Sequence, residues 1–308
     1  MSTATRVAGF VGALAAMFGL ALGVGNVFGP DADPQASTHG ADEPDTAQQA
    51  SADTTDVPEG LMTSQNSYTL ALQAPSAVAG NDVPVTFRIT GPDGAAVTKY
   101  DVEHEKRVHL IAVRRDFTGF QHVHPELSSD GTWATELDLT PGQWRLLADF
   151  KPSGADALTL GADLAIAGDY RPAEPAGESR TAEVGEYTVT LEGNLSAGAD
   201  SKLTLSVAQK GRPVTDLEPY LGAYGHLVAL RVGDLAYLHV HPDGALDDGT
   251  TKPGPDVVFY AAVPSTGTYR LYLDFKHQGV VRTAAFTVGS TDAATPEPTN
   301  TDDAHTGH

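Results

Sequence analysis

The feature that most constrains the fold of this chain is an internal duplication. Residues 108–125 and 225–242 align without a gap at an offset of 117 residues, as VHLIAVRRDFTGFQHVHP over GHLVALRVGDLAYLHVHP. Residues 142–151 and 267–276 form a second matching pair, GQWRLLADFK over GTYRLYLDFK, at an offset of 125 residues. Two collinear blocks of this kind indicate two copies of one domain. The length of 308 residues also suits two domains of ordinary size.

Each copy shows the pattern of short β-strands. Segments such as SYTLALQ and EYTVTLEG alternate apolar and polar residues, and no stretch after residue 60 keeps a helical period. About seven short strands in about 100 residues are typical of an immunoglobulin-like sandwich. We therefore predict an all-β fold with two tandem immunoglobulin-like β-sandwich repeats, at residues 65–167 and 183–289, joined by a linker at 168–182.

The N-terminal segment points to a membrane. No charged residue lies between Arg6 and Asp31, and an apolar stretch of about 20 residues suffices to cross a bilayer. A basic residue before this stretch and acidic residues after it place the repeats outside. We predict a transmembrane helix or signal segment at 1–29, a disordered acidic linker at 30–64 and a disordered tail at 290–308. The protein is then a single-pass cell-membrane protein facing outward, or secreted if the segment is cleaved.

Composition excludes several classes of function. The formal charge is -21, with 19 basic and 40 acidic residues, which disfavours binding to nucleic acid. The absence of cysteine excludes disulfides, zinc fingers and blue-copper sites. Only three methionines occur, all before the first repeat, which disfavours a thioether site for Cu(I). Any bound metal must therefore be held by imidazole, carboxylate or water.

Six histidines fall at equivalent positions of the two copies. Two histidines separated by one residue project from the same face of a strand. In the second copy, pairing Val232 with Leu235 in a hairpin places His226 opposite His241. Cβ atoms of opposed residues lie about 4.5–5.5 Å apart, so three imidazoles can converge on one ion. We predict one Cu(II) or Zn(II) per repeat, held by His109, His122 and His124 in the first and by His226, His239 and His241 in the second.

Further polar residues surround these positions. Each copy has one unmatched histidine, His104 in the first and His277 in the second, and we predict these as fourth ligands. For the first site, nearby acidic residues could supply oxygen ligands or hydrogen-bond acceptors: Asp101, Glu103, Glu105 and Glu126. The duplication also repeats an arginine and an aspartate on one strand, Arg145 with Asp149 and Arg270 with Asp274. We interpret these residues as members of surface or inter-strand ion pairs.

Enzyme motifs are missing from the sequence. It contains no GxSxG, Walker loop or HExxH pattern. The HxH of binuclear hydrolases belongs to a barrel with alternating helices, which this pattern does not predict. We therefore expect a metal-binding protein and no enzyme. The alternative is a structural module of the cell envelope in which the histidines are structural and the partner is an envelope protein.

The two long blocks resemble known proteins. HLIAVRRDFTGFQHVHP and GHLVALRVGDLAYLHVHP resemble segments of uncharacterised, exported actinobacterial proteins described as heavy-metal-binding, and the resemblance covers residues 65–289. The architecture is also similar, at fold level, to the small extracytoplasmic sandwiches of the YtkA and CopC groups, which are associated with copper handling. The histidine that CopC proteins carry at the mature N-terminus has no equivalent here. The resemblance implies copper, whereas the spacing alone supports any transition metal that takes nitrogen and oxygen ligands.

Overall fold

The computed structural model describes residues 57–246 and 248–292, and within these ranges the protein is all-β. The prediction of two tandem β-sandwich repeats is confirmed, and both repeats belong to one compact unit. The predicted membrane segment at 1–29, most of the acidic linker and most of the C-terminal tail lie outside the described residues. In the part of the chain that is described, no helix has the length and apolar character needed to cross a membrane.

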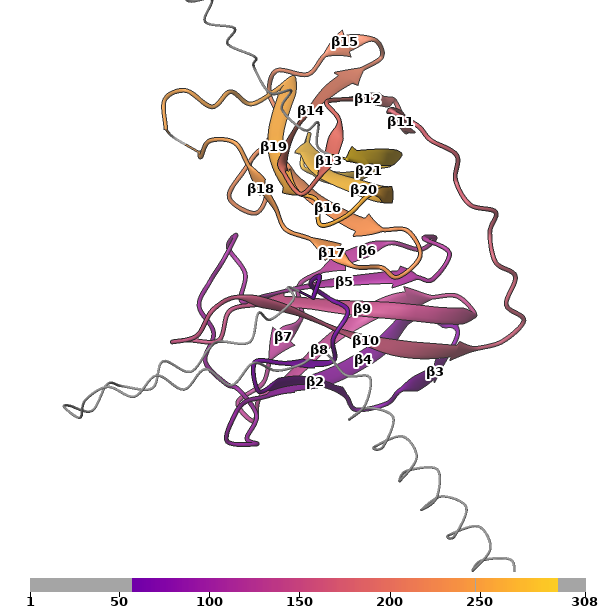
Figure 1. Cartoon of the computed structure of the whole chain (residues 1–308), viewed down its shortest axis with the longest axis vertical. Coiled ribbons are helices and arrows are strands. Elements are labelled where there is room, and N and C mark those ends of the chain that lie inside the picture. The colour runs from indigo at the N-terminus through magenta and orange to yellow at the C-terminus, as the bar shows by residue number, and fades with distance from the viewer. Residues whose placement is uncertain (1–56, 247, 293–308) are drawn as a thin grey trace, which may run out of the picture. The chain divides into compact units, whose positions relative to one another are not determined.

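The first repeat consists of two sheets that pack face to face (Figure 1). In spatial order, one sheet contains β1 (Ser64–Gln65), β2 (Tyr68–Leu72), β4 (Gly80–Thr90), β8 (Thr132–Leu139) and β7 (Glu126–Leu127). The other contains β3 (Ser76–Val78), β10 (Leu158–Ala167), β9 (Gly142–Phe150), β5 (Val108–Arg114) and β6 (Gln121–Val123).

The second repeat has the same two-sheet plan. One sheet contains β11 (Thr181–Val184), β12 (Tyr187–Glu192), β14 (Asp200–Gln209), β19 (Asp256–Ala262) and β18 (Val240–Pro242), with β15 (Arg212–Pro213) beside β14. The other contains β13 (Leu195–Ala197), β21 (Val280–Asp292), β20 (Gly267–His277), β16 (His226–Arg231) and β17 (Tyr237–Leu238).

Each repeat has its own hydrophobic core between its two sheets. In the first, Phe87 and Trp133 from one sheet meet Leu110 and Trp144 from the other. In the second, Phe259 packs in the same way against side chains of β16, β20 and β21. The alternation of apolar and polar residues along β4 and β14 follows from this arrangement, because only one face of these strands is buried.

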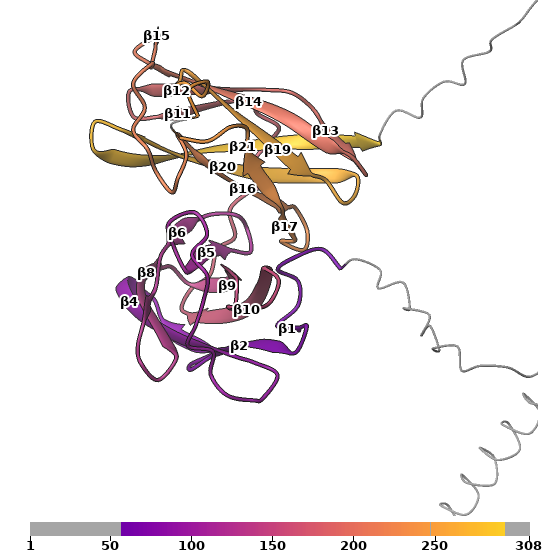
Figure 2. The same ribbon diagram turned by 90° about the vertical axis from the view of Figure 1, so that its left-hand side faces the viewer.

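A third apolar cluster joins the two repeats. Ile111, Val113 and Leu147 of the first repeat pack with Val228 and Tyr272 of the second. Both views of the chain place β5 and β6 beside β16 and β17 (Figures 1 and 2). The sheets that contain β5 and β16 are therefore covered on both faces. This explains why Leu110–Val113 and Leu227–Leu230 are apolar without alternation.

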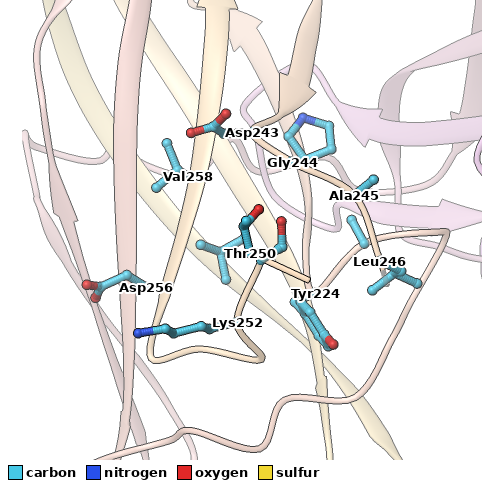
Figure 3. Close-up of a pocket in the computed structure, with 13 residues that line it drawn as sticks. Tyr224, Asp243, Gly244, Ala245, Leu246, Thr250, Lys252, Asp256 and Val258 are labelled. Carbon is cyan, nitrogen blue, oxygen red and sulfur yellow. The ribbon is translucent and has the colours of Figure 1, made fainter. Parts of the chain in front are cut away.

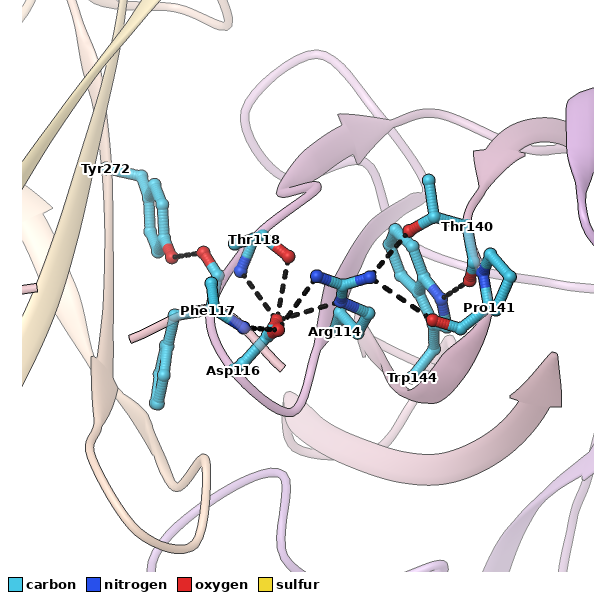
Figure 4. Close-up of polar contacts among 9 residues, drawn as sticks. Arg114, Asp116, Phe117, Thr118, Thr140, Pro141, Trp144 and Tyr272 are labelled. Atoms are coloured by element: carbon cyan, nitrogen blue, oxygen red, sulfur yellow. Dashed lines mark hydrogen bonds and ion pairs between the residues drawn. The ribbon is translucent and has the colours of Figure 1, made fainter. Parts of the chain in front are cut away.

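The tip of the β5–β6 hairpin supplies a polar contact to this junction. The Tyr272 hydroxyl donates a hydrogen bond of 3.0 Å to the carbonyl oxygen of Phe117, and the rings of Phe120 and Tyr272 stack with centroids 3.8 Å apart. Asp116 shapes the tip by accepting two hydrogen bonds from Arg114 and two from Thr118 (Figure 4). The junction is thus packed and hydrogen-bonded around the hairpin that carries the first histidine trio.

Candidate metal centre

The first predicted histidine trio is brought together on the β5–β6 hairpin. The hairpin pairs Ile111 with His122, so that His109 and His124 follow on the same side of the same two strands. One ligand atom from each of His109, His122 and His124 lies within 4.8 Å of the others. This face of the hairpin is the face turned toward the second repeat, where Ile111 and Val113 join the apolar junction.

The proton on His122 is positioned by the second repeat. The Nδ1 atom of His122 lies 2.9 Å from Oδ2 of Asp274, and the two side chains are only 2% and 3% exposed. The other carboxylate oxygen of Asp274 accepts a hydrogen bond from the Thr283 hydroxyl. A carboxylate only accepts hydrogen bonds, so Nδ1 of His122 carries the proton. The Nε2 atom of the neutral ring then presents a lone pair.

The backbone positions the proton on His109 in the same manner. The Nε2 atom of His109 lies 3.1 Å from the carbonyl oxygen of Glu103, which can only accept. The remaining nitrogen, Nδ1, lies 3.1 Å from Nε2 of His122. With both rings neutral, two nitrogen lone pairs therefore face each other. A positive charge between or beside these two nitrogens, from a proton or a metal ion, would remove the repulsion between the two lone pairs.

Burial disfavours a proton on three of the four imidazole rings in this place. Burial lowers the pKa of His109 to about 3, with a further contribution from the neighbouring His122. Burial likewise lowers the pKa of His124 to about 4 and holds the pKa of His226 well below its usual range. For metal–nitrogen bonds of about 2.0–2.1 Å at angles of about 90–110°, two ligand nitrogens lie about 2.9–3.4 Å apart. The separation of 3.1 Å between the facing nitrogens fits this range.

The ring of a histidine of the second repeat lies beside this trio, although this histidine is not part of the group whose ligand atoms converge within 4.8 Å. The ring centroid of His226 lies 4.8 Å from that of His122 and 5.4 Å from that of His109. The Nε2 atoms of His124 and His226 are buried, and neither has a hydrogen-bond partner within residues 57–246 and 248–292. Buried nitrogens of this kind are rare in proteins, because an unmade hydrogen bond costs free energy. From the spacing of the histidines, His226 was expected to belong to a separate site in the second repeat.

The predicted fourth ligand of the first repeat, His104, lies at the rim of this cluster. Its ring centroid is 6.1 Å from that of His109 and 5.7 Å from that of His226, and the residue is exposed. His104 and Glu105 are the central residues of a two-residue turn, with φ of 47° and 66°. Hydrogen bonds in both directions between Glu103 and Lys106 close the turn. Positive φ at both central positions is the geometry of a type I′ turn, which favours glycine or asparagine.

The second predicted trio does not assemble, which corrects the expectation of one similar site in each repeat. The β16–β17 hairpin has the expected register, with Leu230 opposite Tyr237 and Ala229 opposite Leu238. However, the chain leaves this sheet after Leu238, and β18 pairs with β19 in the other sheet. His239 and His241 are consequently exposed, with their ring centroids 5.4 Å apart. In the first repeat the pairing continues to Val123, which keeps its trio together.

His277, the predicted fourth ligand of the second repeat, is a structural histidine in this fold. The residue is buried, at 4% exposure. Its Nε2 atom lies 3.1 Å from Oδ1 of Asp216, and its Nδ1 atom lies 2.8 Å from the Tyr187 hydroxyl. A proton on Nε2 donated to Asp216 leaves Nδ1 to accept from Tyr187. Both ring nitrogens are therefore used within the protein, and neither is free for a metal.

The acidic residues have other roles than those predicted. Asp101 and Glu103 lie 4.0 Å and 3.5 Å from the Lys151 ammonium, on the surface. Glu105 and Glu126 are exposed, and neither belongs to the trio of converging ligand atoms. The carboxylate that orients a histidine is Asp274, which the sequence analysis interpreted as half of an ion pair.

The repeated arginines and aspartates do not pair with each other. Arg145 instead contacts Asp163 at 3.1 Å and the carbonyl oxygen of Gly60 at 2.6 Å, and Arg270 donates to the Thr287 hydroxyl. The recurrence of Asp149 and Asp274 at equivalent positions was the signal that could have indicated a role for Asp274 at the junction.

A separate cavity of about 310 Å³ lies in the second repeat (Figure 3). Its wall includes part of the loop that lengthens the second copy, with Asp243, Leu246 and Lys252, and also Tyr224. None of the described residues that line it is a histidine. This cavity therefore does not belong to the predicted metal sites.

The solved structures that match this chain share little sequence with it. A DUF4426 family protein from Pseudomonas aeruginosa is 10% identical, with 37% of this chain and 99% of that chain covered and a TM-score of 0.28. The Escherichia coli adhesin FdeC is 15% identical, with coverage of 74% and 65% and a TM-score of 0.24. The Yersinia pseudotuberculosis adhesin InvE is 12% identical, with coverage of 73% and 59% and a TM-score of 0.21. These scores are too low to support an argument about function.

Sequence comparison gives a family but no activity. No curated protein matches the chain. One family matches twice, at residues 63–163 and 182–292, so that each match covers one repeat. The two matches together cover more than half of the chain. The protein therefore belongs to the family described as Domain of unknown function (DUF8832), of which it carries two tandem copies.

Proposed function

We propose that this protein binds a transition-metal ion, Cu(II) or Zn(II), through His109, His122 and His124. The observation that carries this proposal is the pair of facing nitrogens, Nδ1 of His109 and Nε2 of His122, at 3.1 Å. Their other nitrogens are committed to a backbone carbonyl and a carboxylate, which accept and do not donate. A metal ion supplies the positive charge that this arrangement requires.

The donor set determines which ions the cluster favours. Imidazole nitrogen suits copper and zinc, whereas magnesium and calcium prefer oxygen ligands. At equal availability the Irving–Williams order favours Cu(II) over Zn(II) at an all-imidazole site. The hydrogen bond between His122 and Asp274 is the pattern that commonly orients a metal-binding histidine and makes it a better donor.

The biological role that fits these features is metal buffering, delivery or sensing outside the cytoplasm, without catalysis. The uncharged segment after Arg6 supports export and anchoring in the cytoplasmic membrane. The resemblance to heavy-metal-binding proteins and to the YtkA and CopC groups supports copper as the cargo. In this proposal the repeats are immunoglobulin-like sandwiches, and the partners are the metal ion and an envelope protein that receives it.

Calorimetric titration of residues 54–308 with Cu(II) and with Zn(II) tests the proposal. The double variant His122→Ala/His124→Ala removes two of the three ligands and should abolish tight binding. The matched control is His239→Ala/His241→Ala, which removes the exposed HxH pair of the second repeat and should leave tight binding intact. If the wild-type protein binds neither ion more tightly than the His122→Ala/His124→Ala variant, the histidines are structural and the envelope-module alternative is favoured.

A further inference from the structure

We propose that His226, from the second repeat, is the fourth ligand, so that the protein holds one ion at the junction of its two repeats. This inference rests on the metal site proposed above and extends it. It replaces the expectation of one ion in each repeat. The ion then binds both repeats at once, with three histidines from the first and one from the second.

The spacing of the imidazole rings supports four ligands. With metal–nitrogen bonds of about 2.0–2.1 Å and ring centres about 1.1 Å further out, two ligands at about 90–110° have ring centres about 4.5–5.3 Å apart. The ring centroid of His122 lies 4.9 Å from that of His124 and 4.8 Å from that of His226. The ring centroid of His109 lies 5.1 Å from that of His124 and 5.4 Å from that of His226. Three of these four distances fall within this range, and the distance between His109 and His226 lies just above it.

The unpartnered nitrogen of His226 is a second and independent observation. Its Nε2 atom is buried and has no hydrogen-bond partner among the described residues. The strand that carries it, β16, is otherwise apolar on this face, where Val228 and Leu230 pack into the junction. Leaving a buried polar atom unsatisfied in such surroundings is costly, and coordination of a metal would satisfy it.

The second repeat also contributes the residue that orients a ligand. Asp274 lies opposite His226 on the neighbouring strand and accepts the hydrogen bond from His122. The rings of His109 and His226, which are equivalent residues of the two copies, lie nearly parallel, with an interplanar angle of 7°. The junction thus brings together the equivalent strands of the two repeats. It adds His226 to the three histidine ligands of the first repeat.

His104 is less suited to be the fourth ligand. It is exposed, and its centroid distance of 6.1 Å from His109 exceeds the range for neighbouring ligands of one ion. The assignment of His226 therefore rests on burial and on spacing.

Two measurements on residues 54–308, with Cu(II) alone as the probe, test this inference. Calorimetry should give one tight site per chain, and X-ray absorption at the copper edge should count four imidazoles. The variant His226→Ala should lower the affinity for Cu(II) by at least about tenfold. It should also lower the count to three imidazoles. The control His239→Ala, at a position that lies outside the cluster, should change neither quantity.

The outcomes separate this inference from the proposed function. Two tight ions per chain, or three imidazoles in the wild-type protein, would overturn the role of His226 while leaving metal binding by the first repeat in place. Unchanged affinity in a folded His226→Ala variant would do the same. Absence of tight binding by the wild-type protein would defeat the proposed function itself. The imidazole count of the wild-type protein decides the question even if His226→Ala fails to fold.

Discussion

Nδ1 of His109 lies 3.1 Å from Nε2 of His122, and when both rings are neutral their other hydrogen-bond partners leave these two nitrogens without protons. The partners come from different places: a backbone carbonyl of the first repeat and a buried carboxylate of the second. The hairpin of the first repeat holds the two rings together, and the second repeat supplies the carboxylate that fixes the tautomer of His122.

Replacing Asp274 with asparagine should weaken metal binding. The change removes the negative charge that holds the Nδ1 proton of His122, and loss of such a partner typically costs about 10–100-fold in metal affinity. Asp149→Asn, the equivalent change in the first repeat, is the matched control, because Asp149 bonds to Thr159 and to no histidine of the cluster among the described residues. Competition titration with a chromogenic chelator gives both affinities. Equal losses in the two variants would assign the effect to general destabilisation.

Metal should raise the stability of the folded protein. A ligand that binds only the folded state adds about 2.7 kcal/mol to the free energy of unfolding at 100 times its dissociation constant. Thermal unfolding of residues 54–308 with and without Zn(II) should show a higher midpoint with the ion. The shift should vanish in His122→Ala/His124→Ala and persist in His239→Ala/His241→Ala. A shift that survives in the first variant would place the ion elsewhere.

The contribution of Asp149 to stability should fall as pH rises from about 4 to about 7, whereas the buried histidines with lowered pKa values contribute in the opposite direction. Burial, together with the charge of Glu59, raises the pKa of Asp149 from 3.8 to about 7. The folded state thus binds this proton more tightly than the unfolded state, so deprotonation disfavours folding across this range. Between pH 5 and pH 7.5, denaturant unfolding should show that the free energy of unfolding changes less favourably in the wild type than in Asp149→Asn. Identical changes in the two proteins would exclude this contribution of Asp149.

Replacing Glu105 with glycine should stabilise the turn that carries His104. Glu105 has a φ of 66°, a conformation that costs a residue with a side chain about 1 kcal/mol or more. The equivalent turn of the second repeat already has glycine there, Gly222 at φ 79°, and a Cβ added to it would meet no other atom within 4 Å. The reverse change, Gly222→Ala, should therefore destabilise the protein through backbone strain alone. Chemical denaturation of both variants checks the opposite signs.

The sequence predicts much of this fold because its signals are local. The alternation of apolar and polar residues along β4 and β14 indicates strands with one buried face. The repeated sequence blocks indicate the duplication. The register of the second hairpin was also predicted, from Val232 and Leu235, and the observed pairs of Ala229 with Leu238 agree with it. The junction between the repeats left a signal as well, in the unbroken apolar runs at Leu110–Val113 and Leu227–Leu230.

The composition of the candidate site could not be predicted from spacing alone. The same HVHP segment keeps its histidines beside His109 in the first repeat and carries them to the other sheet in the second. The difference depends on where the chain leaves the sheet, after Val123 in the first repeat and after Leu238 in the second. The HVHP segments are identical, so their residues do not reveal this point. The inclusion of His226 and Asp274 depends on docking between the repeats, a long-range packing effect that no local pattern encodes.

Anomalous diffraction at the zinc edge, from crystals of residues 54–308 grown with Zn(II), tests the central claim most directly. The account predicts one strong peak about 2.0–2.1 Å from Nδ1 of His109 and from Nε2 of His122, with His124 and His226 completing the shell. A junction without a peak, in crystals whose zinc lies only at the exposed pair His239 and His241, would contradict it.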